Sequence, residues 1–378
     1  MFEDIVDLRR WLHSNPELSG NERNTGAMLV RLLENLSPTH LHQNVGGCGI
    51  VAVWHYSDSA KTVAFRADID ALPINETLDV PYKSVVDGVS HKCGHDGHAA
   101  ILLKLAELVA ANKPKLNIVL IFQAEEETGN GAKNILNSGV LDKYSIDEIY
   151  GFHNLPKYSL NAVVLKHGTF AAASVGVVIK MQGRQTHAAH PEKGINPDKA
   201  IANIINSMTK YNQHYVDTND VRQATLIYIK AGEVAFGTAA GNAEIGYTLR
   251  AFTNNAMSEL QEFLNAELGR LKEEYGLEIS TEYREPFAAT ENNNESVDVV
   301  KQVADKLETE VCQLDLPFRW SEDFAEYLKC YKGAFFGVGA GMECLELHHP
   351  NYDFPDDIII PTANFLFAIA KEFEDRND

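Results

Sequence analysis

The sequence lacks the long hydrophobic segments and the cysteine pattern that mark membrane and secreted proteins. No apolar run approaches the roughly 18 residues that a membrane-spanning helix needs. The first residues, Met1-Phe2-Glu3-Asp4, include neither a basic group nor an apolar stretch, so we do not expect a secretory signal. The five cysteines are odd in number and scattered, which is unlike a disulfide framework. These absences predict a cytoplasmic protein with reduced thiols.

Positive charge is scarce as well. The chain has 33 lysines and arginines against 53 aspartates and glutamates, which gives a formal charge of −20. Such a surface repels phosphate backbones and anionic lipids, so we expect neither nucleic acid nor a membrane as a partner. The sequence also contains no Gly-x-x-x-x-Gly-Lys-Ser/Thr loop and no Gly-x-Ser-x-Gly elbow. P-loop nucleotide enzymes and serine hydrolases with that elbow are therefore poor hypotheses.

The hydrophobic pattern predicts two kinds of architecture in one chain. A length of 378 residues exceeds the roughly 250–300 residues at which single cores stop growing. The first part alternates helices with apolar strands, which indicates an α/β domain with a largely parallel sheet flanked by helices. The strands are expected near 50–54, 62–67, 118–122 and 149–152, and the helices near 29–36 and 98–111.

A different texture begins after about residue 170. Four alternating strands and two helices, one of them starting at Asn196-Pro197, predict an inserted α+β unit of ferredoxin-like size. The tail then returns to helix, strand and helix, and we expect Pro361 to kink or delay the last helix. The predicted domains are 1–167 with 286–378, and an inserted domain at 168–285.

The most informative cluster is His91-Lys92-Cys93-Gly94-His95-Asp96-Gly97-His98. In an extended segment, side chains two residues apart point the same way, so Cys93 and His95 could face one ion. Thiolate and imidazole are good ligands for zinc and similar metals. The alternative is a buried, inert cysteine beside exposed histidines. Four potential donors within eight residues favour the metal site, with His98 opening the next helix in a structural or supporting role.

Three consecutive glutamates, Glu125, Glu126 and Glu127, follow the apolar run at 118–122. A solvated acidic run is the ordinary interpretation of such a segment. In open α/β sheets, however, ligands bind beyond the carboxyl ends of the strands. One carboxylate could therefore bind a metal while its neighbour acts as a general base.

Other candidate residues are ambiguous when each is taken alone. Asp68 and Asp70 follow a strand and could orient a ligand histidine or simply cap a turn. His153 ends another strand, His348 lies near the C-terminus, and His187 lies in the inserted domain. Six further histidines have no partner pattern and are treated as ordinary: His13, His40, His42, His55, His167 and His214.

Taken together and in this order, these segments resemble a family of two-metal amidohydrolases and exopeptidases. The family includes hippurate hydrolase, the plant auxin-conjugate hydrolases, aminoacylase and carboxypeptidase G. The Cys-Gly-His-Asp-Gly-His string at 93–98 is similar to the hippurate and auxin-conjugate branch. Further matching strings lie at 11–18, 66–73, 121–123, 321–324 and 347–350, so the resemblance covers nearly the whole chain.

The resemblance implies a role for each matching residue. The metal ligands would be Cys93, His95, Glu127, His153 and His348. Glu126 would be the general acid/base, and Asp70 would support the site from behind. His187 matches a lid-domain histidine that commonly reaches the active site of a partner subunit. The inserted domain would then be a lid and dimerisation domain, and the protein a homodimer.

The sequence departs from the family pattern at three places. Ala124 and Glu125 stand where relatives commonly have Pro-Ala, which makes the choice of base and ligand depend on register. The segment 235–241 replaces an Asn-x-x-Pro loop that contacts substrate in many relatives. His349 follows His348 where a serine is frequent, so His349 could replace or assist His348 as a ligand.

These features predict a hydrolase that cleaves the amide bond of small N-acyl amino acids or dipeptide-like compounds. Two divalent ions, with zinc, manganese, cobalt and nickel all compatible, would activate a water molecule for attack. Glu126 would take its proton and later protonate the leaving nitrogen. The alternatives are a dipeptidase or carboxypeptidase of the same family, and a catalytically silent metal- or amino-acid-binding homologue.

Overall fold

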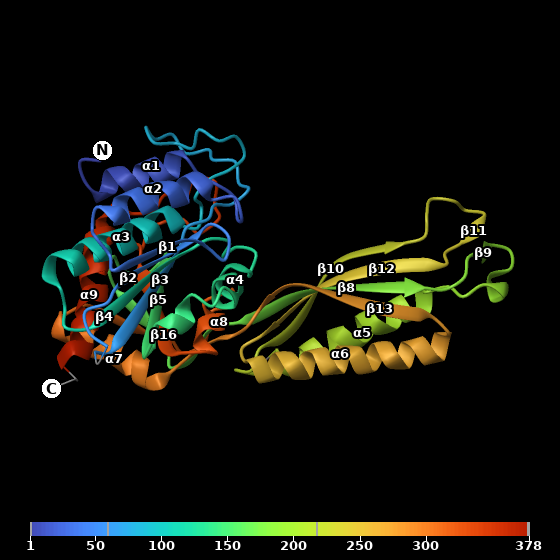
Figure 1. The fold of residues 1–378 in the computed structure, drawn as a ribbon. Coiled ribbons are helices and arrows are strands. Elements are labelled where there is room, and N and C mark those ends of the chain that lie inside the picture. Colours follow the sequence, from blue (N-terminus) through green and yellow to red (C-terminus); the bar gives the residue numbers. More distant parts are fainter. Residues whose placement is uncertain (1, 59, 217, 376–378) are drawn as a thin grey trace. The chain divides into compact units, whose positions relative to one another are not determined.

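The computed structural model describes residues 2–58, 60–216 and 218–375 (Figure 1). The chain forms two compact units, each with its own hydrophobic core. The larger unit contains the chain up to Phe170, the segment Thr290–Asp315 and the chain from Asp323 onward. The smaller unit contains Ala171–Ala289 and Leu316–Glu322. We expected the segment Leu316–Glu322 to belong to the larger domain. In the structure it belongs to the smaller unit, where Arg250 Nη1 donates to the carbonyl of Arg319 at 2.7 Å.

The larger unit is built on a mixed sheet of eight strands, as the hydrophobic pattern predicts. In spatial order the strands are β1 (His40–Val45), β2 (Gly49–Trp54), β4 (Asn117–Gln123), β3 (Thr62–Asp68), β5 (Glu148–Leu155), β16 (Lys332–Gly339), β6 (Val163–Leu165) and β15 (Val311–Gln313). The centre of the sheet, β4-β3-β5-β16, is parallel throughout. Parallel strands are buried on both faces, which explains the continuous apolar runs of β3 and β4.

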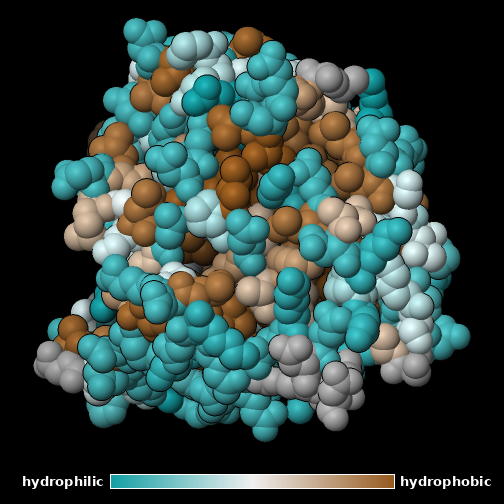
Figure 2. Space-filling model, turned by 90° about the vertical axis from the view of Figure 1, so that its left-hand side faces the viewer, coloured by the Kyte–Doolittle hydropathy of each residue, from teal (hydrophilic) through white to brown (hydrophobic). Residues whose placement is uncertain are grey.

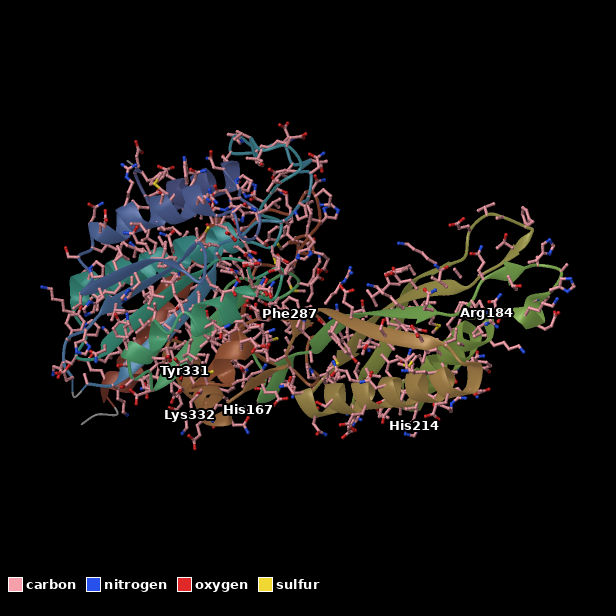
Figure 3. The ribbon with its side chains drawn as sticks, turned by 45° about the vertical axis from the view of Figure 1, so that its right-hand side comes forward. His167, Arg184, His214, Phe287, Tyr331 and Lys332 are labelled. Atoms are coloured by element: carbon pink, nitrogen blue, oxygen red, sulfur yellow. The ribbon has the colours of Figure 1, made fainter. Side chains whose placement is uncertain are left out.

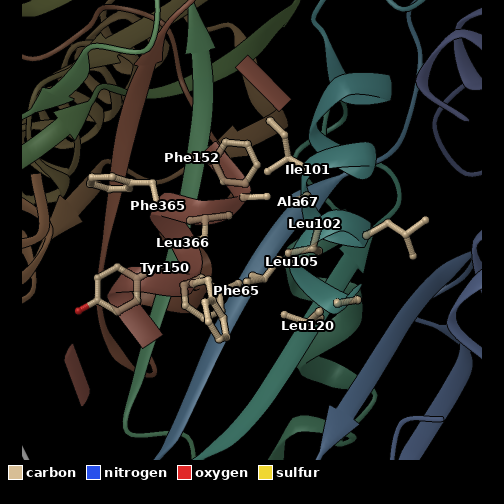
Figure 4. Close-up of a cluster of buried hydrophobic side chains, with 14 of the residues drawn as sticks. Phe65, Ala67, Ile101, Leu102, Leu105, Leu120, Tyr150, Phe152, Phe365 and Leu366 are labelled. Carbon is tan, nitrogen blue, oxygen red and sulfur yellow. The ribbon is translucent and has the colours of Figure 1, made fainter. Parts of the chain in front are cut away.

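Helices cover both faces of this sheet. They are α1 (Ile5–Ser14), α2 (Arg23–Glu34), α3 (His95–Asn112), α4 (Gly131–Asn137), α7 (Asn294–Lys306), α8 (Ala325–Leu328) and α9 (Ile359–Asp375). Residues of α1, α2, α3, α7 and α9 form one core cluster with the strands. Figure 4 shows part of it, with Ile101 and Leu105 of α3 and Phe365 of α9 around Phe65 and Phe152. This core fixes α3 and the sheet relative to each other.

The smaller unit has the ferredoxin-like arrangement that the sequence predicts. Its order along the chain is β8 (Ala173–Gln182), α5 (Asp198–Tyr215), β10 (Arg222–Ala231), β12 (Asn242–Ala251), α6 (Asn254–Tyr275) and β13 (Glu278–Phe287). The four strands form an antiparallel sheet in the order β10-β12-β8-β13. Alternate residues of the strands pack on α5 and α6, which cover one face of the sheet.

Two short strands, β9 (Thr186–His187) and β11 (Thr238–Ala239), pair antiparallel in the smaller unit. Arg184, labelled in Figure 3, lies at the end of the unit that carries them, and its backbone pairs with Ile195. His187 therefore lies on a short ladder rather than in an open loop. A further small sheet pairs β7 (Gly168–Ala171) with β14 (Thr290–Asn292).

Two sequence-based expectations about helices are wrong in detail. The helix expected from His98 begins three residues earlier, at His95, with Gly94 as its N-cap in the left-handed region at φ 95°. The last helix is neither kinked nor delayed by Pro361, because α9 begins at Ile359 and the proline falls in its first turn. A first-turn N–H has no acceptor within the helix, so proline costs little there.

The described surface combines many hydrophilic side chains with some exposed hydrophobic ones. Figure 2 shows one face, on which hydrophilic side chains cover much of the surface and hydrophobic ones lie between them. Scattered exposed apolar side chains are normal for folded proteins. Among the described residues, every helix is too short or too polar to cross a membrane.

Candidate metal centre

Most predicted site residues of the larger unit come from the ends of neighbouring strands and from one helix start, and His348 comes from the loop after β16. Asp70 follows β3, Glu126 and Glu127 follow β4, and His153 lies near the end of β5. Because β4, β3 and β5 are adjacent and parallel, their carboxyl ends meet at one edge of the sheet. The start of α3 brings His95 to the same edge.

Cys93 and His95 do converge, although they do not lie in one extended segment as predicted. His95 is the first residue of α3, so the pair is not part of one extended strand. The left-handed Gly94 turns the chain between them instead. A Cβ atom on Gly94 would lie 2.7 Å from Asn154 Oδ1, so no larger residue fits at this turn.

The donor atoms form overlapping clusters. Among the described residues, five groups of three ligand atoms have all their atoms within 4.8 Å of one another. Three of the groups consist of predicted site residues, and they are Cys93 with His95 and His153, Cys93 with Glu127 and His348, and His95 with Glu126 and Glu127. The other two are Asp68 with His95 and His98, and Glu126 with Glu322 and Asp323. Cys93 Sγ lies 3.4 Å from His153 Nε2. Glu127 Oε1 lies 3.9 Å from His95 Nε2 and 3.8 Å from His348 Nε2. Cys93 belongs to two of these clusters, so its thiolate could be a ligand that two ions share.

The chemistry of these atoms fits a bound cation. His95 Nε2 and Glu127 Oε1 are both buried and lack hydrogen-bond partners within the described part of the chain. Buried polar atoms are normally satisfied, so an exception of this kind needs an explanation. Two lone-pair donors that face each other across 3.9 Å are satisfied together by a metal ion between them.

Burial also disturbs the protonation of the donors. It raises the pKa of the Cys93 thiol well above its usual value, and nearby Glu127 and Glu126 raise it further. Burial raises the pKa of Glu127 to about 7, against the opposing charge of His95. Burial lowers the pKa of His153 well below its usual value. Metal ligands must be deprotonated, so cation binding would replace protons at this site.

Asp70 holds His95 in the orientation that a ligand needs. Its Oδ1 lies 3.0 Å from His95 Nδ1, which leaves Nε2 directed at the cluster. Asp70 Oδ2 accepts the hydroxyl of Ser19 at 2.7 Å and the backbone N–H of Glu127 at 3.0 Å. Burial lowers the pKa of His95, but Asp68, Asp70 and Glu127 more than offset it and raise it to about 10.

The three consecutive glutamates have different environments. Glu125 has the left-handed φ of 63° and turns its side chain away, where it accepts Thr128 Oγ1–H and Asn134 Nδ2–H. Glu126 remains by the cluster, and its Oε1 accepts the N–H of Asp323 at 3.4 Å. Glu127 provides the orphaned oxygen. The structure thus keeps Glu126 and Glu127 at the site and excludes Glu125.

The two C-terminal histidines are also distinguished. His348 adopts φ 65° and directs Nε2 toward Glu127. His349 is exposed, and its Nδ1 accepts the N–H of Asn351 at 3.1 Å. Among the described residues, no donor cluster includes His349. His348 is therefore the candidate ligand of this pair.

His98 belongs to a further donor group with Asp68 and His95, whereas His187 belongs to no donor group among the described residues. His98 contacts Asp68 Oδ1 through Nδ1 and Asn154 Oδ1 through Nε2, each at 2.6 Å, so both ring nitrogens are engaged. These contacts place His98 beside the site, and its supporting role stays a prediction. His187 belongs to the smaller unit, where its exposed side chain accepts the N–H of Ala189 at Nδ1.

Sequence reasoning missed several buried residues that support the site. Glu22 Oε1 accepts the backbone N–H groups of Gly20 and Glu125, both at 2.9 Å, and so fixes the start of the glutamate segment. Asp323 accepts bonds from Arg66 Nη2 and Gln123 Nε2. His13, which we treated as ordinary, is fully buried between two carboxylates. The only signal in the sequence was that some of these residues fall within strings matching the family.

Comparisons with known proteins agree with this geometry. Residues 64–372 match the profile of peptidase family M20/M25/M40. Hippurate hydrolase of Campylobacter jejuni is 30% identical, covering 98% of this chain and 96% of its own. N-acetyl-L-cysteine deacetylase of Bacillus subtilis is also 30% identical, covering 100% of this chain and 89% of its own.

A solved structure with the same fold is the Bacillus subtilis YXEP protein, described as a dinuclear metal-binding peptidase of the M20 family. It is 26% identical, covers 98% of this chain and 97% of its own, and superposes with a TM-score of 0.85. With the family profile matched over most of the length and a buried set of metal donors in place, the chain belongs to peptidase family M20/M25/M40 and is a metal-dependent hydrolase.

Proposed function

We propose that this protein hydrolyses the amide bond of small N-acyl amino acids. The observation that carries the proposal is the pair of donor clusters that share Cys93, with Glu126 beside them. The names of the two 30% identical relatives point to the same bond, since hippurate and N-acetylcysteine are both N-acyl amino acids. A small substrate also suits a site whose donors are mostly buried.

Two divalent ions fit the donors, with zinc, manganese, cobalt or nickel all compatible. One would take Cys93, His95 and His153, and the other Cys93, Glu127 and His348. When bound, such ions lower the pKa of a water molecule from ~15.7 toward about 7 and polarise the substrate carbonyl.

The residues of the chain supply the proton transfers. Glu126 is 6% exposed and lies in a donor cluster with His95 and Glu127, so its carboxylate can accept a proton from the attacking water. The same carboxyl group then donates that proton to the leaving nitrogen. Asp70 fixes the imidazole of His95 throughout, and Cys93 and Glu127 remain ionised.

His187 would complete the site by donating a hydrogen bond to the oxyanion of the tetrahedral intermediate. Loss of a comparable donor costs roughly 100–1,000-fold in rate. In this proposal the inserted segment at 168–285 acts as a lid and dimerisation domain, and His187 serves the partner subunit of a homodimer. The edge strand β10 supports a homodimer, because Leu226, Ile227 and Ile229 on it are 39%, 58% and 43% exposed. An exposed apolar edge strand favours pairing with another chain.

The dimer proposal predicts complementation between two inactive variants. Glu126→Gln and His187→Ala homodimers are mixed at equal amounts and allowed to exchange subunits. If His187 acts in the partner's site, about half of the dimers are mixed and one of their two sites has both residues, so about a quarter of wild-type activity returns. Mixed dimers without activity would show that His187 acts within its own chain, and a monomeric mass at micromolar concentration would contradict the homodimer.

The substrate class is tested with a panel of N-acetyl and N-benzoyl amino acids, dipeptides and longer peptides on metal-loaded protein. We expect kcat/KM to be highest for an N-acyl amino acid. Preference for a dipeptide or a longer peptide would make the protein a dipeptidase or carboxypeptidase instead. Bound metal with no turnover of any compound would indicate a catalytically silent homologue.

A further inference from the structure

Buried charged residues that belong to no donor cluster surround the segment carrying Cys93 and His95. Lys92 and Asp96 flank these two candidate ligands, and their side chains are fully buried. Buried charges are costly unless they are paired and hydrogen-bonded. The partners of these two side chains therefore show what the local structure is built to hold.

The partners form a closed ring of groups that are all buried except the partly exposed Asp353. Lys92 Nζ lies 2.5 Å from Glu76 Oε1, which lies 2.9 Å from His13 Nε2. His13 Nδ1 lies 2.8 Å from Asp96 Oδ2, which lies 3.0 Å from Arg9 Nε. Arg9 Nη2 reaches Asp353 Oδ1 at 2.5 Å. Lys92 Nζ closes the ring by donating to the carbonyl of Tyr352, the residue before Asp353, at 2.8 Å.

This charge ring, defined as Arg9, His13, Glu76, Lys92, Asp96 and Asp353, joins two segments that are far apart in the sequence. One segment carries Cys93 and His95, and the other carries His348. Lys92 contacts the second segment twice, because its side chain binds Tyr352 and its backbone carbonyl accepts the N–H of His348 at 2.7 Å. The first turn of α3 is also packed closely, since a Cβ atom on Gly97 would overlap the ring of Phe354.

His348 is the candidate ligand that most needs such support. It has a positive φ of 65°, which is uncommon for residues other than glycine, and its side chain is 50% exposed. A side chain on a loop, half in solvent, is not held by core packing. Its direction depends on the backbone contacts of its own segment, and Lys92 contacts that segment at the N–H of His348 and at the carbonyl of Tyr352.

We propose that Lys92 is a positioning residue that fixes His348 relative to Cys93, and so sets the affinity for the ion that His348 binds. The proposal rests on the two-metal function proposed above. Lys92 acts through the loop and touches neither substrate nor metal. Outer groups that orient metal ligands typically change metal affinity by roughly 10–100-fold when they are removed.

The test compares Lys92→Met with Lys104→Met by equilibrium dialysis of metal-free protein against Zn²⁺. Lys104 lies on α3, which also carries His95, and pairs with Glu107 at the surface. It therefore controls for loss of a lysine in the same unit, away from the candidate ligands. We expect wild type and Lys104→Met to bind two ions, whereas Lys92→Met binds one ion normally and the second at least 10-fold more weakly. A residue with only a structural role would lower the melting temperature without this split.

Lys92→Met leaves Glu76 without its lysine, which could impair folding. The double variant Lys92→Met/Glu76→Gln removes the negative charge that Lys92 balanced, while His13 still contacts the side chain, but it does not restore the bond to Tyr352. We expect it to fold and still to show the weakened second ion, and to show faster hydrogen exchange in a peptide spanning 346–356 of the metal-free protein. If both variants bind both ions with wild-type affinity, the positioning role of Lys92 is refuted but the two-metal function is not. A wild-type protein that binds fewer than two ions would overturn the two-metal function as well.

Discussion

Replacing Glu126 with glutamine is expected to lower kcat by about 10²–10⁴-fold while both metal ions stay bound. The reason is that glutamine keeps the shape of the side chain and can still accept the N–H of Asp323, but cannot take a proton from water. Turnover of an N-acyl amino acid and metal content by elemental analysis are measured on the same preparation. The separation of the two readouts is what identifies a base rather than a ligand.

The neighbouring glutamates provide matched controls for the same substitution. Glu127→Gln is expected to lose metal together with activity, because Oε1 of Glu127 belongs to clusters with His95, Cys93 and His348. Glu125→Gln is expected to keep most of the activity and all of the metal, because its carboxylate bonds Thr128 and Asn134 away from the site. If metal is lost from Glu126→Gln and kept in Glu127→Gln, the roles of base and ligand are exchanged.

Much of this site could be predicted from the sequence because the relevant signals are local. Apolar runs locate β3, β4 and β5, and polar residues directly after them must lie at the carboxyl edge of a parallel sheet. The family strings then distinguish residues such as Cys93 and His348 from ordinary loop residues. The ferredoxin-like unit was predictable for the same reason, since its strands alternate clearly between apolar and polar residues.

The remaining features depend on contacts between distant segments, which a single sequence does not specify. His13 has no local pattern, and its importance follows only from its position between Glu76 and Asp96. Lys92 is one member of a histidine-rich string in the sequence, and its importance follows only from its bond to Tyr352. The sequence does not mark the start of α3, because its N-cap is the left-handed Gly94, which has no capping side chain. His348 rather than His349 faces Glu127 because its backbone has a positive φ, which the sequence does not reveal.

Replacing Cys93 with alanine is expected to abolish tight binding of both ions, and with it all activity. In the proposed two-ion arrangement, Cys93 is the one donor assigned to both ions, with His95 and His153 at one ion and Glu127 and His348 at the other. Its thiolate is also the softest donor present, which suits zinc and cobalt. Removal of one shared ligand should therefore affect two binding events, whereas removal of His153 or His348 should affect mainly one.

The effect can be followed through stability as well as activity. Metal that binds only the folded state at 1,000 times its Kd raises the free energy of unfolding by about 4 kcal/mol. We expect a Zn²⁺-dependent rise in the melting temperature of wild type and of Cys330→Ala, a control at an exposed cysteine. The same titration should leave the melting temperature of Cys93→Ala unchanged. A chelator should lower the melting temperature of wild type to that of Cys93→Ala. Two ions retained at wild-type affinity in Cys93→Ala would refute the shared-ligand arrangement, because each remaining cluster would then have to bind its ion without a thiolate.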